Sequence, residues 1–256
     1  MMKRTLILGI LLLQTVLQAS AQYTLGKADT VSVVEWKLPL ETRYTDQLTT
    51  LKRYTKDMER FAQYNQIPDS TQCDILFLGS SSIRRWTSLK KDMAPAKVIN
   101  RAFGGSMMRT QLFDYDVVVK PMKADKIVLY VENDLPSVKT PVTVYQTFDF
   151  FRLFCGKLRQ DFPEAKIYIL SLKPSPSRTK FWNEVNTLNF LLKEYCASNA
   201  DFTYVDVASP MFNEKGEPQE DIFGPDRLHM NEKGYQLWTG IVRKAVLADC
   251  SCDTEN

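Results

Sequence analysis

Short apolar segments, separated by stretches long enough for crossover connections, constrain the fold of this chain most strongly. They comprise residues 74–78, 97–100, 126–131, 166–170 and 202–207. Apolar runs of this length are typical of strands that are buried on both faces of a parallel sheet. Because parallel neighbours need long crossovers, the stretches between the runs are expected to contain helices.

The stretches between and around these runs have the length of helices. Residues 46–64 place apolar side chains three or four positions apart, and residues 143–161, 180–199 and 231–248 are long enough for further helices. Such alternation predicts an α/β fold, a three-layer α/β/α sandwich around a mainly parallel five-stranded sheet. The Pro-rich residues 173–177 are expected to form an irregular loop.

The first residues have the pattern of an export signal. Lys3 and Arg4 precede a mostly apolar run at residues 6–17, and small residues end at Ala21. No later stretch reaches the roughly 20 apolar residues of a membrane helix. The sequence therefore predicts a secreted or periplasmic protein whose signal peptide is cleaved near Ala21. The expected parts are the signal peptide (1–21), an extension with a helix packed on the domain (22–70), one α/β domain (71–248) and a polar tail (249–256).

Charge and cysteine content exclude several classes of protein. The 33 basic and 30 acidic residues become nearly balanced once Lys3 and Arg4 are removed, which argues against a nucleic-acid partner. The five cysteines are odd in number and lack zinc-ligand spacing, so no metal is expected. Three lie beside apolar segments and are expected to be small buried side chains, whereas two lie in the tail: Cys73, Cys155, Cys196, Cys250 and Cys252.

A serine follows the first predicted strand. Ligands of open α/β sheets bind beyond the carboxyl ends of the strands, and Gly79-Ser80-Ser81-Ser82 stands at such an end. A serine nucleophile needs a neighbouring base and donors for the oxyanion that forms on attack. Ser81 is a candidate nucleophile, although the same turn is equally typical of a helix N-cap.

The only histidine of the chain is His229, and Asp226 precedes it by three positions. At a helix entrance this spacing lets a carboxylate fix the tautomer of the imidazole, as in a catalytic triad. A lone histidine near a helix start is also typical of a capping or surface residue.

Taken together, these motifs resemble those of the SGNH (GDSL-like) hydrolases. Four dispersed blocks carry the resemblance, in the same order as in the family: residues 77–86 around Ser81, residues 100–106 with Gly104 and Gly105, Glu132-Asn133-Asp134, and Asp226 with His229. The resemblance implies the flavodoxin-like SGNH fold and the activity of a carboxylic ester hydrolase without a cofactor. It implies Ser81, His229 and Asp226 as catalytic residues, and Ser81, Gly105 and Asn133 as the oxyanion hole.

Two positions depart from the family pattern. Ser80 replaces a common aspartate, which is not the nucleophile. Val131 replaces a glycine, and a β-branched side chain there is unsuited to positive φ and is expected to crowd or shift Asn133.

Several alternatives remain open at this stage. Acetylated carbohydrate is the expected ester, lysophospholipase or general lipase activity is the second candidate, and a catalytically weak glycan-binding protein is the third. A phosphoester hydrolase lacks the expected metal ligands and phosphate loop. The arginines Arg84, Arg85 and Arg101 are expected at the surface, while Trp86 and Trp182 are candidates for a pocket wall or for the core.

Overall fold

The computed structural model describes residues 52–136 and 142–248, and the chain divides into two compact units, Met1–Tyr54 and Thr55–Asn256. The predicted signal peptide, Cys250 and Cys252 lie outside the described residues, as do residues 46–51 of the first predicted helix. In the first unit a 3-10 turn covers Lys52–Tyr54. All of the following elements belong to the second unit.

A five-stranded, entirely parallel sheet forms the centre of this unit. The strand order is β2-β1-β3-β4-β5, so the chain winds first to one side of β1 and then to the other. The strands are β1 (Gln72–Gly79), β2 (Val98–Asn100), β3 (Lys123–Tyr130), β4 (Lys166–Leu170) and β5 (Phe202–Val205). The predicted α/β sheet is confirmed, and every predicted strand is present with its ends shifted by a few residues.

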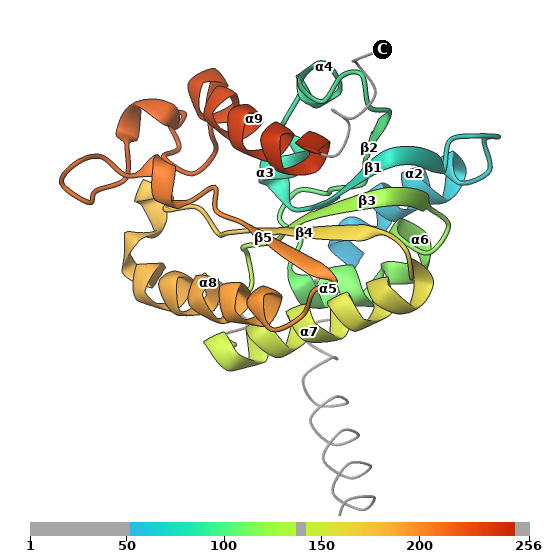
Figure 1. The fold of residues 1–256 in the computed structure, drawn as a ribbon, viewed down its shortest axis with the longest axis horizontal. Coiled ribbons are helices and arrows are strands. Elements are labelled where there is room, and N and C mark those ends of the chain that lie inside the picture. Colours follow the sequence, from blue (N-terminus) through green and yellow to red (C-terminus); the bar gives the residue numbers. More distant parts are fainter. Residues whose placement is uncertain (1–51, 137–141, 249–256) are drawn as a thin grey trace, which may run out of the picture. The chain divides into compact units, whose positions relative to one another are not determined.

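Helices cover both faces of the sheet. Figure 1 shows α3, α4 and α9 on one face and α5, α7 and α8 on the other, which is the expected three-layer arrangement. The helices are α2 (Thr55–Tyr64), α3 (Ser81–Arg84), α4 (Leu89–Asp92), α5 (Met108–Phe113), α6 (Tyr115–Val118), α7 (Val144–Asp161), α8 (Trp182–Ala197) and α9 (Glu232–Leu247). Further 3-10 turns cover Pro176–Phe181, Ser209–Met211 and Glu220–Ile222.

The longest helices, α7, α8 and α9, coincide with the long stretches that were expected to be helical, and α7 begins at a capping box. Thr143 accepts a hydrogen bond from the Gln146 amide, and the Gln146 side chain accepts one from the Thr143 amide. The short helices α4 to α6 were not predicted, because four to six residues are too few to show a helical period. The Pro-rich segment is less irregular than expected, since its end forms a 3-10 turn.

The centre of the sheet is fully buried. Leu76, Phe77 and Leu78 of β1 and Val128 and Leu129 of β3 expose none of their surface. Strands covered by helices on both faces need apolar side chains at successive positions, which explains the continuous apolar runs. This rigid pair of strands supports the loops that follow it.

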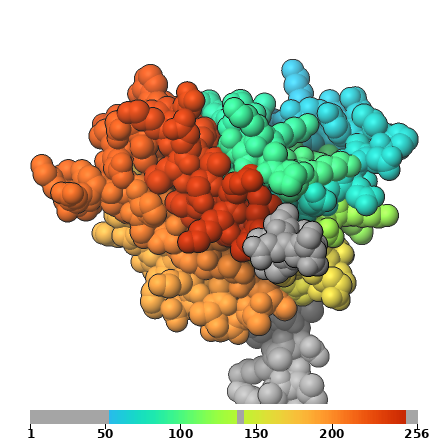
Figure 2. Space-filling view, turned by 45° about the horizontal axis from the view of Figure 1, so that its top comes forward, coloured from blue at the N-terminus to red at the C-terminus, as the bar shows by residue number. Residues whose placement is uncertain are grey.

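Helix α9 is fixed against the segment that follows β1. In Figure 2 the red segment with α9 lies directly against the green segment that contains α4. Arg243 donates to the Asp92 and Ala94 carbonyls at 2.7 and 2.6 Å, and the Tyr235 hydroxyl donates to the Ser82 carbonyl at 3.0 Å. The start of α9 is therefore held close to the start of α3.

Candidate active site

Ser81 is the first residue of α3 and follows directly on the end of β1. Gly79 makes this sharp turn possible, because its φ is +153° and a Cβ on it would lie 2.2 Å from the Tyr130 carbonyl oxygen. The Ser80 amide donates to that same carbonyl at 3.0 Å. Ser81 is thus presented at the carboxyl end of the sheet with its side chain partly exposed.

The Gly79 carbonyl ties this turn to the loop after β2. It accepts hydrogen bonds from the Phe103 amide at 3.1 Å, the Ser106 hydroxyl at 3.0 Å and the Gln111 side chain at 3.0 Å. A backbone carbonyl with three donors is strongly constrained, since each bond restricts its direction. The loop that holds Gly104 and Gly105 is therefore positioned against the Ser81 turn.

A compact loop between residues 223 and 230 presents His229. The Gly224 amide donates to the His229 carbonyl at 2.8 Å, and Arg227 takes the left-handed conformation with φ of +53°. The Asp226 carboxylate accepts the Leu228 and His229 amides at 3.0 and 2.9 Å. These bonds turn the carboxylate toward the histidine ring.

The three predicted catalytic side chains lie in one hydrogen-bonded row. His229 Nε2 lies 2.9 Å from Ser81 Oγ, and His229 Nδ1 lies 2.6 Å from Asp226 Oδ2. The imidazole hydrogen bond, aided by the His229 and Leu228 amides, holds the pKa of Asp226 well below its usual range. An ionised Asp226 favours the tautomer that carries its proton on Nδ1, which leaves Nε2 as an acceptor for the Ser81 hydroxyl.

Gly105 and Asn133, the other predicted site residues, lie in the loops that follow β2 and β3. Gly105 has a φ of +77°. Tyr130 pairs in register with Gly79, so Asn133 and Ser81 both lie just beyond the ends of adjacent strands. The Asn133 amide group donates to the Ser106 carbonyl at 2.9 Å, which joins the two loops.

Val131 does not distort this loop. Its side chain is 1% exposed, and the described non-glycine residues with positive φ are Asp69 and Arg227. The position therefore has an ordinary backbone conformation, and a glycine is not needed there.

A buried ionic cluster beside Asn133 was not foreseen. Lys173 Nζ lies 2.7 and 2.8 Å from the two carboxylate oxygens of Glu132, and the Tyr130 hydroxyl donates to Glu132 at 2.5 Å. Arg178 contacts Glu132 at 3.5 Å and donates to Asn133 Oδ1 at 2.8 Å. The Pro-rich composition around Lys173 indicated an irregular loop, and nothing local in the sequence showed the burial of this side chain.

The expected surface position of Arg101 is wrong. This side chain is 3% exposed and donates to the Val117 and Val118 carbonyls at 2.7 and 3.1 Å, so it fixes α6 to the loop after β2. Desolvation lowers the pKa of the guanidinium to about 10. Arg84 and Arg85 are exposed, as expected.

The two tryptophans singled out as possible pocket walls have different positions. Trp86 is 2% exposed and belongs to the core, where its ring nitrogen donates to Asp92 at 2.6 Å. Trp182 is partly exposed, and its ring centroid lies 5.0 Å from that of Phe212.

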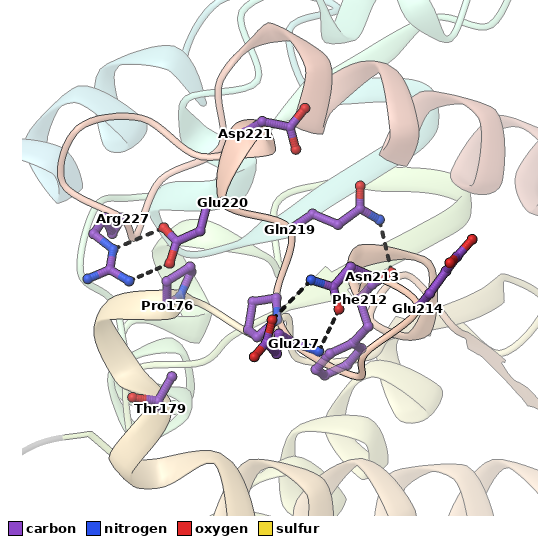
Figure 3. Close-up of a pocket in the computed structure, with 11 residues that line it drawn as sticks. Pro176, Thr179, Phe212, Asn213, Glu214, Glu217, Gln219, Glu220, Asp221 and Arg227 are labelled. Carbon is purple, nitrogen blue, oxygen red and sulfur yellow. Dashed lines mark hydrogen bonds and ion pairs between the residues drawn. The ribbon is translucent and has the colours of Figure 1, made fainter.

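An open pocket of about 890 Å³ lies beside the histidine loop. Figure 3 shows its carboxylates and amides, with Arg227 paired to Glu220 and Asn213 bonded to Glu217. The pocket reaches the histidine loop through Arg227, the neighbour of Asp226 in the chain. The lining residues are Pro176, Thr179, Phe212, Asn213, Glu214, Glu217, Pro218, Gln219, Glu220, Asp221 and Arg227.

The cysteines and acidic residues of the described ranges offer no metal centre. Within residues 52–136 and 142–248, no three histidine, cysteine, aspartate or glutamate side chains are grouped so that they could hold an ion. Cys73, Cys155 and Cys196 are buried, as expected, and each carries a free thiol. Burial raises the pKa of the Cys73 thiol to about 12, so it is a poor nucleophile at neutral pH.

This fold, with a serine and a histidine meeting at the carboxyl ends of parallel strands, defines an ester hydrolase of the SGNH class. The chain belongs to the GDSL-like lipase/acylhydrolase family, whose family model matches residues 70–237. The resemblance stated from the four sequence blocks is thereby confirmed. No curated protein matches the chain.

Solved structures with the same fold include several hydrolases. A GDSL-like lipase from Bacteroides thetaiotaomicron is 17% identical with a TM-score of 0.62, over 78% of this chain and 98% of its own. The lipase/acylhydrolase from Enterococcus faecalis is 19% identical with a TM-score of 0.57, over 69% and 96%. A variant of an acetyl xylan esterase from Geobacillus stearothermophilus is 16% identical with a TM-score of 0.55, over 68% and 94%.

No helix within the described part of the chain is long and apolar enough to cross a membrane.

Proposed function

We propose that this family member is an exported serine esterase that removes short acyl groups, such as acetyl, from carbohydrate. The observation that carries the proposal is the row of side chains in which His229 lies 2.9 Å from Ser81 and 2.6 Å from Asp226. A hydroxyl is activated as a nucleophile when a neutral imidazole accepts its proton, and a carboxylate that orients the imidazole strengthens this effect.

In the proposed reaction, Ser81 Oγ attacks the ester carbonyl carbon while its proton passes to His229 Nε2. The oxyanion is held by the Ser81 and Gly105 amides and the Asn133 side chain, and Asp226 stabilises the imidazolium. Collapse of the tetrahedral intermediate transfers the proton to the leaving alcohol. A water molecule then gives a proton to His229 and attacks the carbonyl carbon of the acyl-enzyme. When this second tetrahedral intermediate collapses, the acid is released and the proton passes from His229 to Ser81 Oγ.

Two observations support carbohydrate esters as the substrates. The predicted signal peptide, residues 1–21, would bring the enzyme to extracellular or periplasmic polysaccharide. Acetyl xylan esterases are also among the proteins of the same fold. Lipid esters remain the second class of substrate to test.

The test is hydrolysis of p-nitrophenyl acetate, followed by acetate release from acetylated xylan and fatty-acid release from lysophospholipid. Ser81→Ala and His229→Ala are each expected to lower kcat by about 10⁴-fold or more, because the nucleophile and its base act together and neither is effective without the other. Ser80→Ala is the matched control, since its hydroxyl has no hydrogen-bond partner in the structure. Unchanged kcat in Ser81→Ala would rule out the triad, and faster fatty-acid than acetate release would rule out the carbohydrate ester.

A further inference from the structure

The side-chain amide of Asn133 can serve an oxyanion in only one of its two orientations. The oxygen and nitrogen ends have nearly the same shape, so packing alone cannot decide which end faces the reacting carbonyl. In the structure, Nδ2 donates to the Ser106 carbonyl at 2.9 Å and Oδ1 accepts from Arg178 at 2.8 Å. A reversed amide would place its NH₂ group against the guanidinium and its oxygen against the carbonyl.

One hydrogen of the Asn133 NH₂ group is used by Ser106, and the other can donate elsewhere. Ser106 alone defines the orientation weakly, because a neutral bond of this kind contributes little net free energy. The bond from the charged Arg178 is stronger than a neutral one. Arg178 is therefore the principal restraint on the direction of the amide.

Arg178 is itself held by the buried ionic cluster. Its guanidinium contacts Glu132 at 3.5 Å, and Glu132 is fixed by Lys173, whose side chain is fully buried. Glu132 and Lys173 carry opposite charges, which leaves the positive charge of Arg178 unbalanced within this group of three. A positive charge beside Asn133 favours negative charge that develops at the same place.

The backbone of the 3-10 turn links this cluster to the histidine loop. The Arg178 amide donates to the Ser175 carbonyl at 2.8 Å, and the Ser177 amide donates to the Arg227 carbonyl at 3.0 Å. A single turn, Pro176–Phe181, thus contacts both Asn133 and the loop that presents His229.

We propose that Arg178, anchored by Glu132 and Lys173, is a positioning residue that holds the Asn133 amide in the orientation that stabilises the oxyanion. The inference rests on the proposed function, because it assigns Arg178 a role through Asn133. It adds a requirement that the triad alone does not contain: the loop after β4 must be folded onto the loop after β3 for full activity.

The experiment is a double-mutant cycle on p-nitrophenyl acetate hydrolysis. Asn133→Ala is expected to lower kcat by about 10²–10³-fold, as for other oxyanion donors. Arg178→Ala is expected to lower kcat by about 10–100-fold with KM within about twofold, because the oxyanion forms only after binding. In the Asn133→Ala background, Arg178→Ala should cost less than about twofold, since its target is already absent.

Two further measurements separate positioning from loss of structure. Millimolar guanidinium chloride should restore part of kcat to Arg178→Ala but none to the double variant. Lys180→Ala, on the same turn and exposed, is the matched control and should keep wild-type kcat. Urea midpoints of all variants are recorded, and if Arg178→Ala is largely unfolded, Arg178→Lys replaces it in the cycle.

The outcomes distinguish the two proposals. If Ser81→Ala or Asn133→Ala retains wild-type kcat, the proposed mechanism fails at the nucleophile or at the oxyanion hole. If Asn133→Ala is impaired but Arg178→Ala is not, or if Arg178→Ala costs the same factor in both backgrounds, the positioning role of Arg178 is wrong.

Discussion

Lys173→Met is expected to destabilise the protein more than any surface lysine replacement, because it leaves a carboxylate buried without its main partner. Lys173 is 2% exposed as a residue, and its ammonium group lies within 2.8 Å of both Glu132 oxygens. Methionine has a similar length and fills the same space without charge. The variant therefore tests the ion pair with little change in packing.

The magnitude follows from what remains around Glu132. Removal of one partner of a buried pair costs about 3–5 kcal/mol. Arg178 at 3.5 Å and the Tyr130 hydroxyl at 2.5 Å still compensate part of the charge, so the expected loss is about 3 kcal/mol. For a domain of this size, that corresponds to a fall in Tm of about 6–12 °C.

The loss should depend on pH in a defined direction. Burial alone would raise the pKa of Glu132, but the charges of Lys173 and Arg178 outweigh it and hold that pKa below its usual range. Without Lys173, only Arg178 supplies positive charge against the effect of burial, so the pKa of Glu132 rises. The penalty in the variant is then fully present at pH 8 and shrinks on acidification, as Glu132 takes up a proton.

The assay is thermal and urea unfolding of wild type and Lys173→Met at pH 8 and pH 5. A second variant, Lys173→Met with Glu132→Gln, removes both charges and keeps an acceptor for the Tyr130 hydroxyl, so it should recover more than half of the lost stability. If the Tm of Lys173→Met lies within about 1 °C of wild type at pH 8, or if the loss of stability is equal at both pH values, Lys173 does not compensate a buried charge on Glu132.

Other predictions concern the turn before Ser81, the desolvated carboxyl group of Asp114 and the triad. Gly79→Ala should lower the urea midpoint markedly, because the added Cβ would lie 2.2 Å from the Tyr130 carbonyl oxygen. Gly156→Ala is the control: its Cβ would meet no atom on the helix surface, so it should raise the free energy of unfolding by about 0.5–1 kcal/mol. Equal effects of the two variants would contradict this. Desolvation raises the pKa of Asp114 to about 6, so stability is lost as the pH rises from about 4, the ordinary pKa of an aspartate, to about 6. Asp114→Asn should therefore raise Tm at pH 8 and change it little at pH 4; a lower Tm at pH 8 would be against it. Asp226→Ala should reduce kcat by about 10²–10⁴-fold, less than His229→Ala, because water can reach the site of the carboxylate, which is 47% exposed. A larger loss of kcat in Asp226→Ala than in His229→Ala would exclude the role of Asp226 in orienting the imidazole.

Patterns within short segments were enough to predict the class of fold and the candidate site. The apolar runs of β1 and β3 need helices on both faces, and residues just after such strands lie at one edge of a parallel sheet. This rule located Ser81 and Asn133, and the only histidine of the chain left one candidate base. The row formed by Ser81, His229 and Asp226 has the expected geometry, while its catalytic role stays a prediction.

The short helices α4 to α6 and the burial of Arg101 could not be predicted in this way. A helix of four residues has no period, and an arginine has the same sequence signal whether it faces water or a carbonyl. Arg101 is buried because the carbonyls of Val117 and Val118, from helix α6, replace its water.

Local preferences are encoded in short segments of the chain: which segments are strands, where the glycine turn falls, and which side chains have nucleophilic or basic chemistry. The burial of charged side chains depends instead on the fold as a whole. Glu132 and Lys173 are 41 positions apart, and they pair because β3 and β4 are adjacent in the sheet. Whether a charge can be buried depends on the groups that surround it in space, and those groups come from distant parts of the chain.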